Sequence, residues 1–79
     1  MEHYMDIGEI PGQINRYGKR WYFTHYNYDN LSNCNDMIHK LEKIHSNFSY
    51  IKIPFVLQVY KNKRSFPQKR YAIYEREVK

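Results

Sequence analysis

The chain has 79 residues, of which 42% are apolar and 18% aromatic, and its formal net charge is +5 at neutral pH. A chain of this length buries roughly 60–65% of its unfolded surface on folding, which predicts a single domain over residues 1–79 with a modest core. The apolar content argues against disorder, and no apolar run approaches the ~20 residues of a membrane-spanning helix.

The N-terminal part of the chain predicts a β-hairpin. Gly18 lies in a turn signal between segments 13–16 and 20–28, and glycine readily adopts the positive φ angles that tight hairpin turns need. Segment 20–28 is rich in aromatic residues and contains neither glycine nor proline. Aromatic side chains favour strands, so this segment is expected to be the second strand of the hairpin.

An amphipathic helix is predicted after the hairpin. Residues 29–33 offer several polar side chains of the types that cap helix N-termini. Apolar side chains then recur at steps of three and four residues, which places them in one stripe along a helix. The members of this stripe are Cys34, Met37, Ile38, Leu41, Ile44 and Phe48.

Two further strands are predicted after the helix. In residues 51–60 the odd positions are all large and apolar, which indicates a strand with one buried side. Pro54 cannot donate a ladder hydrogen bond, so it marks the start of this strand or a sheet edge. Residues 61–69 contain Pro67 and are predicted to form a loop, and residues 70–78 a last strand.

These elements predict an α+β fold in the order β-β-α-β-β, with an antiparallel sheet that carries one amphipathic helix on one face. The order of the strands within the sheet is left open. The helix stripe is expected to pack on Trp21, Phe23, Ile53, Phe55 and Leu57. The opposite sheet face is expected to stay open and to carry Tyr22, Tyr26, Tyr28, Gln58 and Tyr60.

Positive charge is concentrated at the C-terminal end of the sequence. Residues 1–59 hold six basic and six acidic side chains, whereas residues 60–79 hold seven basic and two acidic ones. The entire net charge of +5 therefore lies in the last twenty residues. Exposed charges act over about 8–10 Å in physiological salt, so a local cluster matters more than the total. This cluster indicates either a solvated turn or a contact with phosphate or with an acidic protein surface.

Few residues carry the patterns of a catalytic, metal or cofactor site. The single cysteine, Cys34, excludes an internal disulfide and falls on the apolar helix stripe, which favours a core role. The four histidines lack metal-ligand spacing, and no phosphate-binding loop occurs, so no metal or cofactor is expected. Residues 1–6 do not resemble a secretory signal. A cytoplasmic protein without enzymatic activity is therefore expected.

One enzymatic class remains as a minor alternative. Metal-independent ribonucleases need a base, an acid and cations that stabilise the phosphate in the transition state. Side chains of these types are His25, Arg20, Tyr22, Tyr26, Arg70 and Tyr74. The alternation of His25 with Trp21 and Phe23, however, predicts that His25 points toward the core.

Binding is the function that the sequence favours. Lysine and arginine neutralise phosphates, and aromatic rings stack on unpaired bases or anchor protein interfaces. Phe66 is expected at the tip of the basic loop, where it would be an anchor or a wedge. The candidate binding residues are Lys61, Lys63, Arg64, Phe66, Lys69, Arg70, Tyr22, Tyr26, Tyr60 and Tyr74.

We therefore expect a small binding protein that acts stoichiometrically on a nucleic-acid-handling complex through its basic C-terminal hairpin. In size and composition it resembles phage or mobile-element accessory factors such as anti-CRISPR or anti-restriction inhibitors. Its positive charge disfavours DNA mimicry and favours contact with nucleic acid or with an acidic protein surface. A direct DNA- or RNA-binding regulatory module is the alternative. The sequence leaves open the identity of the partner and the oligomeric state.

Overall fold

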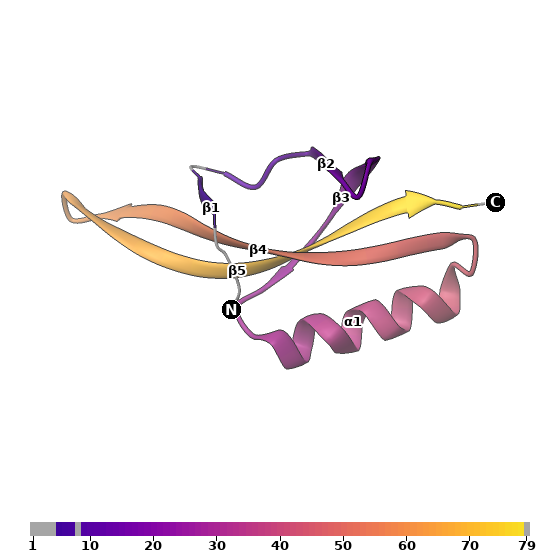
Figure 1. Ribbon diagram of the computed structural model, residues 1–79. Coiled ribbons are helices and arrows are strands. Elements are labelled where there is room, and N and C mark those ends of the chain that lie inside the picture. Colours follow the sequence, from indigo (N-terminus) through magenta and orange to yellow (C-terminus); the bar gives the residue numbers. More distant parts are fainter. Residues whose placement is uncertain (1–4, 8, 79) are drawn as a thin grey trace.

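The chain folds into one mixed β-sheet with a single helix against it (Figure 1). The computed structural model describes the backbone of residues 5–7 and 9–78, and the side chains of residues 9–59 and 62–78. The elements in chain order are β1 (Met5–Ile7), β2 (Gln13–Arg16), β3 (Lys19–Tyr28), α1 (Leu31–Ile44), β4 (Phe48–Lys61) and β5 (Arg64–Glu77). The predicted α+β fold is confirmed by β2-β3-α1-β4-β5, and β1 adds a short strand to it.

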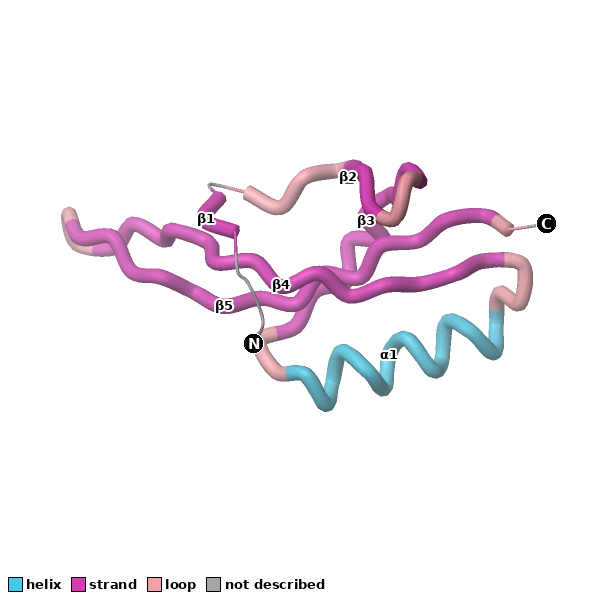
Figure 2. The backbone as a smooth tube through the Cα atoms, in the orientation of Figure 1, coloured by secondary structure: helices cyan, strands magenta, loops and turns pink. Residues whose placement is uncertain are grey.

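The strands lie in the order β1-β4-β5-β3-β2. All neighbouring pairs are antiparallel except β1 and β4, which run parallel. Strands β4 and β5 are each 14 residues long and pair along their whole length, from Phe48 opposite Glu77 to Lys61 opposite Arg64. The molecule is correspondingly elongated, with principal extents of 47 × 25 × 24 Å. Figure 2 shows the far end of this hairpin extending beyond the other strands.

The loop predicted over residues 61–69 is wrong, because only Asn62 and Lys63 connect β4 to β5. Both residues have positive φ angles, 53° and 62°, as in a type I′ turn. Such turns follow the right-handed twist of a two-stranded ribbon, so the strands continue up to the turn itself. Phe66 is therefore not at a loop tip but inside β5, opposite Val59.

Pro67 misled the prediction because a proline usually interrupts a central strand. Strand β5 pairs with β3 only from Tyr71 onward, so at Pro67 one side of β5 has no partner among the described residues. A missing N–H costs nothing on such an unpaired edge, which is where strands tolerate proline. A sequence pattern cannot reveal that a strand is central at one end and an edge at the other.

The predicted helix is confirmed, and its first turn is capped as expected. The Asn30 side chain accepts a hydrogen bond from the backbone N–H of Asn33 through Oδ1, at 2.9 Å. This bond satisfies one of the amide donors that a helix leaves free at its N-terminus. The helix ends at Ile44, so Phe48, which the apolar stripe included, belongs to β4 instead.

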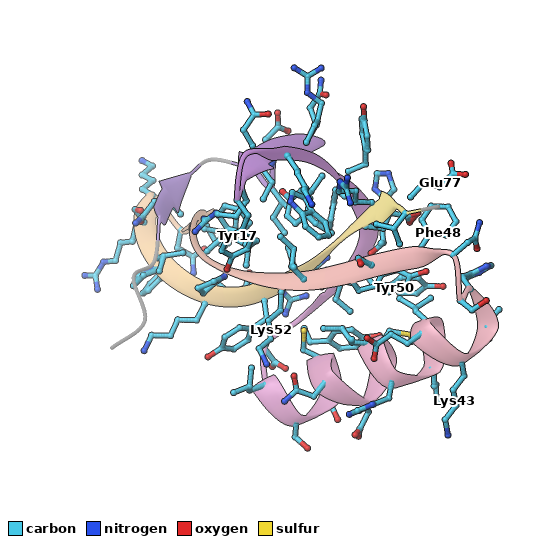
Figure 3. All side chains as sticks on the ribbon, turned by 45° about the vertical axis from the view of Figure 1, so that its right-hand side comes forward. Tyr17, Lys43, Phe48, Tyr50, Lys52 and Glu77 are labelled. Carbon is cyan, nitrogen blue, oxygen red and sulfur yellow. The ribbon has the colours of Figure 1, made fainter. Side chains whose placement is uncertain are left out.

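The helix covers the other face of the sheet from the one predicted. Its buried residues Cys34 and Leu41 pack with Ile73 of β5. Half-buried neighbours complete this helix-side cluster: Tyr28, Met37, Ile38, Tyr50 and Tyr71. Figure 3 shows Tyr50 and Lys52 on the side of β4 that faces α1, and Lys52 Nζ donates to Asn35 Oδ1 at 2.7 Å.

The residues predicted to lie under the helix form a second cluster on the opposite face. Its buried members are Trp21, Ile53, Phe55, Ala72 and Tyr74. The N-terminal segment covers this cluster, since Ile10 and Ile14 pack against it. Tyr74 Oη donates to the Pro11 carbonyl at 2.5 Å, and the backbone N–H of Phe23 donates to the Gly12 carbonyl at 2.9 Å. The sheet thus has a covered core on both faces.

Alkaline pH should destabilise the protein through Tyr74. Burial raises the pKa of Tyr74 to about 12, against an ordinary pKa of 10.0. Between these values the folded chain keeps a phenolic proton that the unfolded chain loses, so the free energy of unfolding should fall as pH rises from about 10 to 12. Urea unfolding at pH 8, 10 and 11.5 would measure this decrease.

The control for this prediction is Tyr74→Phe, which removes the titrating group and keeps the ring. At neutral pH the variant should lose about 1 kcal/mol, because the bond to the Pro11 carbonyl is absent. Above pH 10 its stability should decline less steeply than that of the parent protein. Equal slopes in both proteins would show that other groups cause the alkaline loss.

Candidate functional site

The most prominent accessible feature of the molecule is the far end of the β4-β5 hairpin, residues 58–69, which we call the arm. Strand β1 pairs with β4 only up to Leu57, and β3 pairs with β5 only from Tyr71. Among the described residues, no other strand lies beside the arm, so both of its edges are unpaired. In Figure 1 it projects to the left, away from the helix. Every described side chain of the arm is exposed.

Strand alternation divides the arm into two faces. Cross-strand partners share a face, and Val59 pairs with Phe66. The Phe66 face therefore carries Val59, Arg64, Phe66 and Gln68. The opposite face, the Lys69 face, carries Gln58, Ser65, Pro67 and Lys69. Since Phe55 of the covered core lies on the same side of β4 as Val59, the Phe66 face continues this core into solvent, where Phe66 is 48% and Val59 40% exposed.

The arm carries cations without nearby acids in the sequence. No aspartate or glutamate occurs between Glu42 and Glu75, and Glu75 and Glu77 lie at the far end of β5. Among the described residues, the side chains of Lys63 and Arg64 have no hydrogen-bond or ion-pair partner. The positive charge at the turn is therefore exposed and not neutralised by a described carboxylate.

The inner end of the arm is held by Arg70. Its Nε donates to Asn27 Oδ1 of β3 at 2.8 Å, and the residue is half-buried. Lys69, one position closer to the turn, also takes part in an interaction. Arg70 and Lys69 are thus partly engaged within the protein, whereas Lys63 and Arg64 are the cations most available to a partner.

Two of the predicted binding residues lie outside the described side chains, namely Tyr60 and Lys61. Their backbones are paired in β4, opposite Ser65 and Arg64. The basic residues that the sequence grouped at 61–70 are therefore brought together along one hairpin.

The predicted open face of tyrosines is not formed as expected. Tyr22 and Tyr26 of β3 are exposed, but Tyr28 belongs to the cluster under α1. Tyr74 is fully buried between Phe23 and Phe55, so it is a core residue and its ring is not accessible. This corrects its inclusion among the candidate binding residues. The physical reason is that each sheet face has its own cover, one the helix and the other the N-terminal segment.

His25 does not point into the core as alternation predicted, because β3 contains a bulge there. The register of β3 against β5 shifts between Phe23 and Asn27. Thr24 Oγ1 donates to the Ile73 carbonyl at 2.8 Å and accepts from the Tyr26 N–H at 3.2 Å. His25 is exposed with a φ of 73°, and its ring lies 5.0 Å from that of Phe23. No glycine or asparagine at His25 announced this left-handed residue.

Features typical of other kinds of site are missing from the described part of the chain. No pocket and no group of metal-ligating side chains occurs there. Cys34 is fully buried, and burial raises the pKa of its thiol despite the nearby Lys52 ammonium, so it is not an activated nucleophile. No helix in these residues is long and apolar enough to cross a membrane.

Comparison with known proteins adds no family to this description. No protein-family profile matches the chain, and neither curated proteins nor solved structures give a significant match. The charge, shape and exposure of the arm are therefore the observations that bear on function.

Proposed function

We propose that this protein is a non-enzymatic module that binds nucleic acid directly through its arm. The observation that carries the proposal is the projecting hairpin, which holds Lys63 and Arg64 in solvent without described partners. Exposed lysine and arginine neutralise phosphates and release condensed counterions, which supplies most of the sequence-independent affinity for nucleic acid. A protruding basic ribbon can approach a phosphate backbone that a flat surface would meet less closely.

The backbone at Lys63 supports a role for its charge. Lys63 has a φ of 62° in a turn position that glycine occupies with less strain. A side chain in this left-handed region costs about 1–2 kcal/mol. The equivalent position of the β2-β3 turn is occupied by Gly18. A lysine at the strained position is consistent with a function of its charge at the tip of the arm.

A second candidate function uses the same surface against a protein. Phe66 and Val59 expose apolar area beside Arg64, and aromatic and arginine side chains are enriched among interface hot spots. This combination favours a stoichiometric binder of a nucleic-acid-handling complex, such as an anti-CRISPR or anti-restriction inhibitor. The ribonuclease alternative is not carried forward, because Tyr74 is buried and the bulge turns His25 away from the core cluster.

The proposed function predicts a defined change in salt dependence. Affinity for a fluorescent 20-base-pair duplex is measured by anisotropy between 50 and 200 mM salt, as a buffer choice. The double variant Lys63→Gln, Arg64→Gln removes two phosphate contacts, so the slope of log K against log salt should become shallower by about 1.8. The matched control is Lys40→Gln, Lys43→Gln, which removes two exposed charges from α1, and Lys43 points away from the sheet in Figure 3.

The control variant should bind like the parent protein, because it removes the same charge from a different surface. Lys63→Gly adds a further test, since it should relieve backbone strain and stabilise the hairpin by up to about 1 kcal/mol while it weakens binding. Equal loss of affinity in both double variants would mean that net charge alone drives binding. An unchanged affinity in the arm variant would refute the proposal.

A further inference from the structure

The arm has the cross-section of an element that enters the major groove of B-form DNA. It is a two-stranded antiparallel ribbon with a type I′ turn, and its strands lie about 4.8 Å apart. With side chains on both faces, such a ribbon is about 10 Å thick. The major groove of B-DNA is about 12 Å wide and admits a two-stranded ribbon, whereas the minor groove is about 6 Å wide.

The arm is also long enough to reach the floor of that groove. Beyond Leu57, the last partner of β1, strand β4 continues for the residues from Gln58 to Lys61 before the turn. At about 3.3 Å per residue these add roughly 13 Å, against a groove depth of about 8.5 Å. The tip can therefore reach base edges while the rest of the sheet remains outside the duplex.

The two faces of the arm differ in the hydrogen-bonding groups that they leave free. On the Lys69 face, the Ser65 hydroxyl donates to Gln58 Oε1 at 2.6 Å, so these two side chains satisfy each other. On the Phe66 face, the described side chains of Arg64 and Gln68 have no hydrogen-bond partner. The Phe66 face thus combines free polar groups with the exposed apolar pair of Val59 and Phe66.

We propose that the arm lies in the major groove of duplex DNA with its Phe66 face toward the base edges, an inference that rests on the proposed function. Arg64 suits the acceptors of guanine, and Gln68 suits the donor and acceptor of adenine. Phe66 and Val59 suit the methyl group of thymine. Lys63 at the turn contacts the phosphate backbone and sets the depth of insertion.

Duplex RNA and single strands fit this arm less well. The major groove of A-form RNA is deep and too narrow for a protein ribbon to read. Proteins that bind single strands usually stack successive bases on several aromatic rings, and Phe66 is the arm's one aromatic ring among the described side chains. The geometry therefore selects B-form DNA from the nucleic acids that the proposed function allows.

The first test compares four ligands of one base sequence at one salt concentration. They are duplex DNA, duplex RNA, single-stranded DNA, and duplex DNA with bulky substituents at the pyrimidine C5 positions, which lie in the major groove. Unmodified duplex DNA should bind at least about tenfold more tightly than each of the others. Saturation of the minor groove with netropsin should leave its affinity unchanged.

A second test separates the two faces of the arm with matched glutamine variants. The tightest ligand is first selected from a randomised duplex pool. Gln68→Ala should then lower affinity for that duplex at least about fivefold and relax the preference at one base pair, as loss of a bidentate base contact does. Gln58→Ala, on the Lys69 face, should leave both the affinity and the base preference unchanged.

The outcomes distinguish this inference from the proposed function. If the Lys63, Arg64 variant loses affinity but single strands, duplex RNA or the C5-substituted duplex bind as tightly as plain duplex DNA, binding stands and the groove assignment is wrong. If Gln58→Ala has the effect expected for Gln68→Ala, the wrong face has been assigned to the bases. If no nucleic acid binds, both proposals fail.

Discussion

Replacement of Phe55 with alanine should lower the free energy of unfolding by about 3–5 kcal/mol. Phe55 is fully buried in the cluster beneath the N-terminal segment, and its ring centroid lies 6.3 Å from that of Tyr74. The side chain is large, and the small core around it can collapse only partly into the space it leaves. A domain of this size has a total stability of about 4–12 kcal/mol, so the loss would be a large part of it.

The measurement is urea unfolding followed by fluorescence of Trp21, the single tryptophan, which lies in the same cluster. The matched control is Phe66→Ala, a phenylalanine on the same sheet face but 48% exposed on the arm. Loss of its cross-strand contact with Val59 should cost less than about 1 kcal/mol. Similar losses in the two variants would contradict the placement of Phe55 in the core and Phe66 in solvent.

Replacement of Ile73 with alanine should cost about 2–5 kcal/mol and loosen the helix in particular. Ile73 is fully buried on the opposite face from Phe55, where it packs with Cys34 and Leu41 of α1. These two helix residues are the buried ones of α1, so a cavity at Ile73 weakens the contact that holds the helix to the sheet. Native-state hydrogen exchange of the α1 amides would report this loosening.

The conservative variant Ile73→Val provides the control, because it removes one methylene group and should cost about 0.5–1.5 kcal/mol. In Ile73→Ala the α1 amides should lose more protection than the amides of β3. If the amides of both elements lost protection equally and only by the global amount, the helix would not depend on Ile73 for its docking. That result would contradict the helix-side cluster.

Local signals in the sequence were sufficient to predict the secondary-structure elements and their order. The turn at Gly18, the cap at Asn30 and the apolar stripe from Cys34 to Leu41 each act within a few residues, and the structure confirms each of them. The alternation of residues 51–59 likewise predicted a strand whose odd positions include the buried residues Ile53 and Phe55. Short-range steric and hydrogen-bonding preferences dominate these elements.

The sequence did not determine which face the helix covers. Both faces of β4 and β5 carry large apolar groups, with Phe55 and Tyr74 on one and Tyr50 and Ile73 on the other. Alternation identifies the two faces but does not assign a cover to either. The assignment was decided by the N-terminal segment, whose Ile10 packs on the first cluster and leaves the second to α1. Contacts between distant parts of the chain made that choice.

The same distinction holds for the basic end of the chain. The sequence alone determined that the net charge of +5 lies in the last twenty residues and which side chains carry it. Only the tertiary structure decided that these residues form a projecting ribbon instead of a loop. The physical reason is a difference in strand length, because β4 and β5 pair up to Lys61 and Arg64 while β1 and β3 end their pairing at Leu57 and Tyr71.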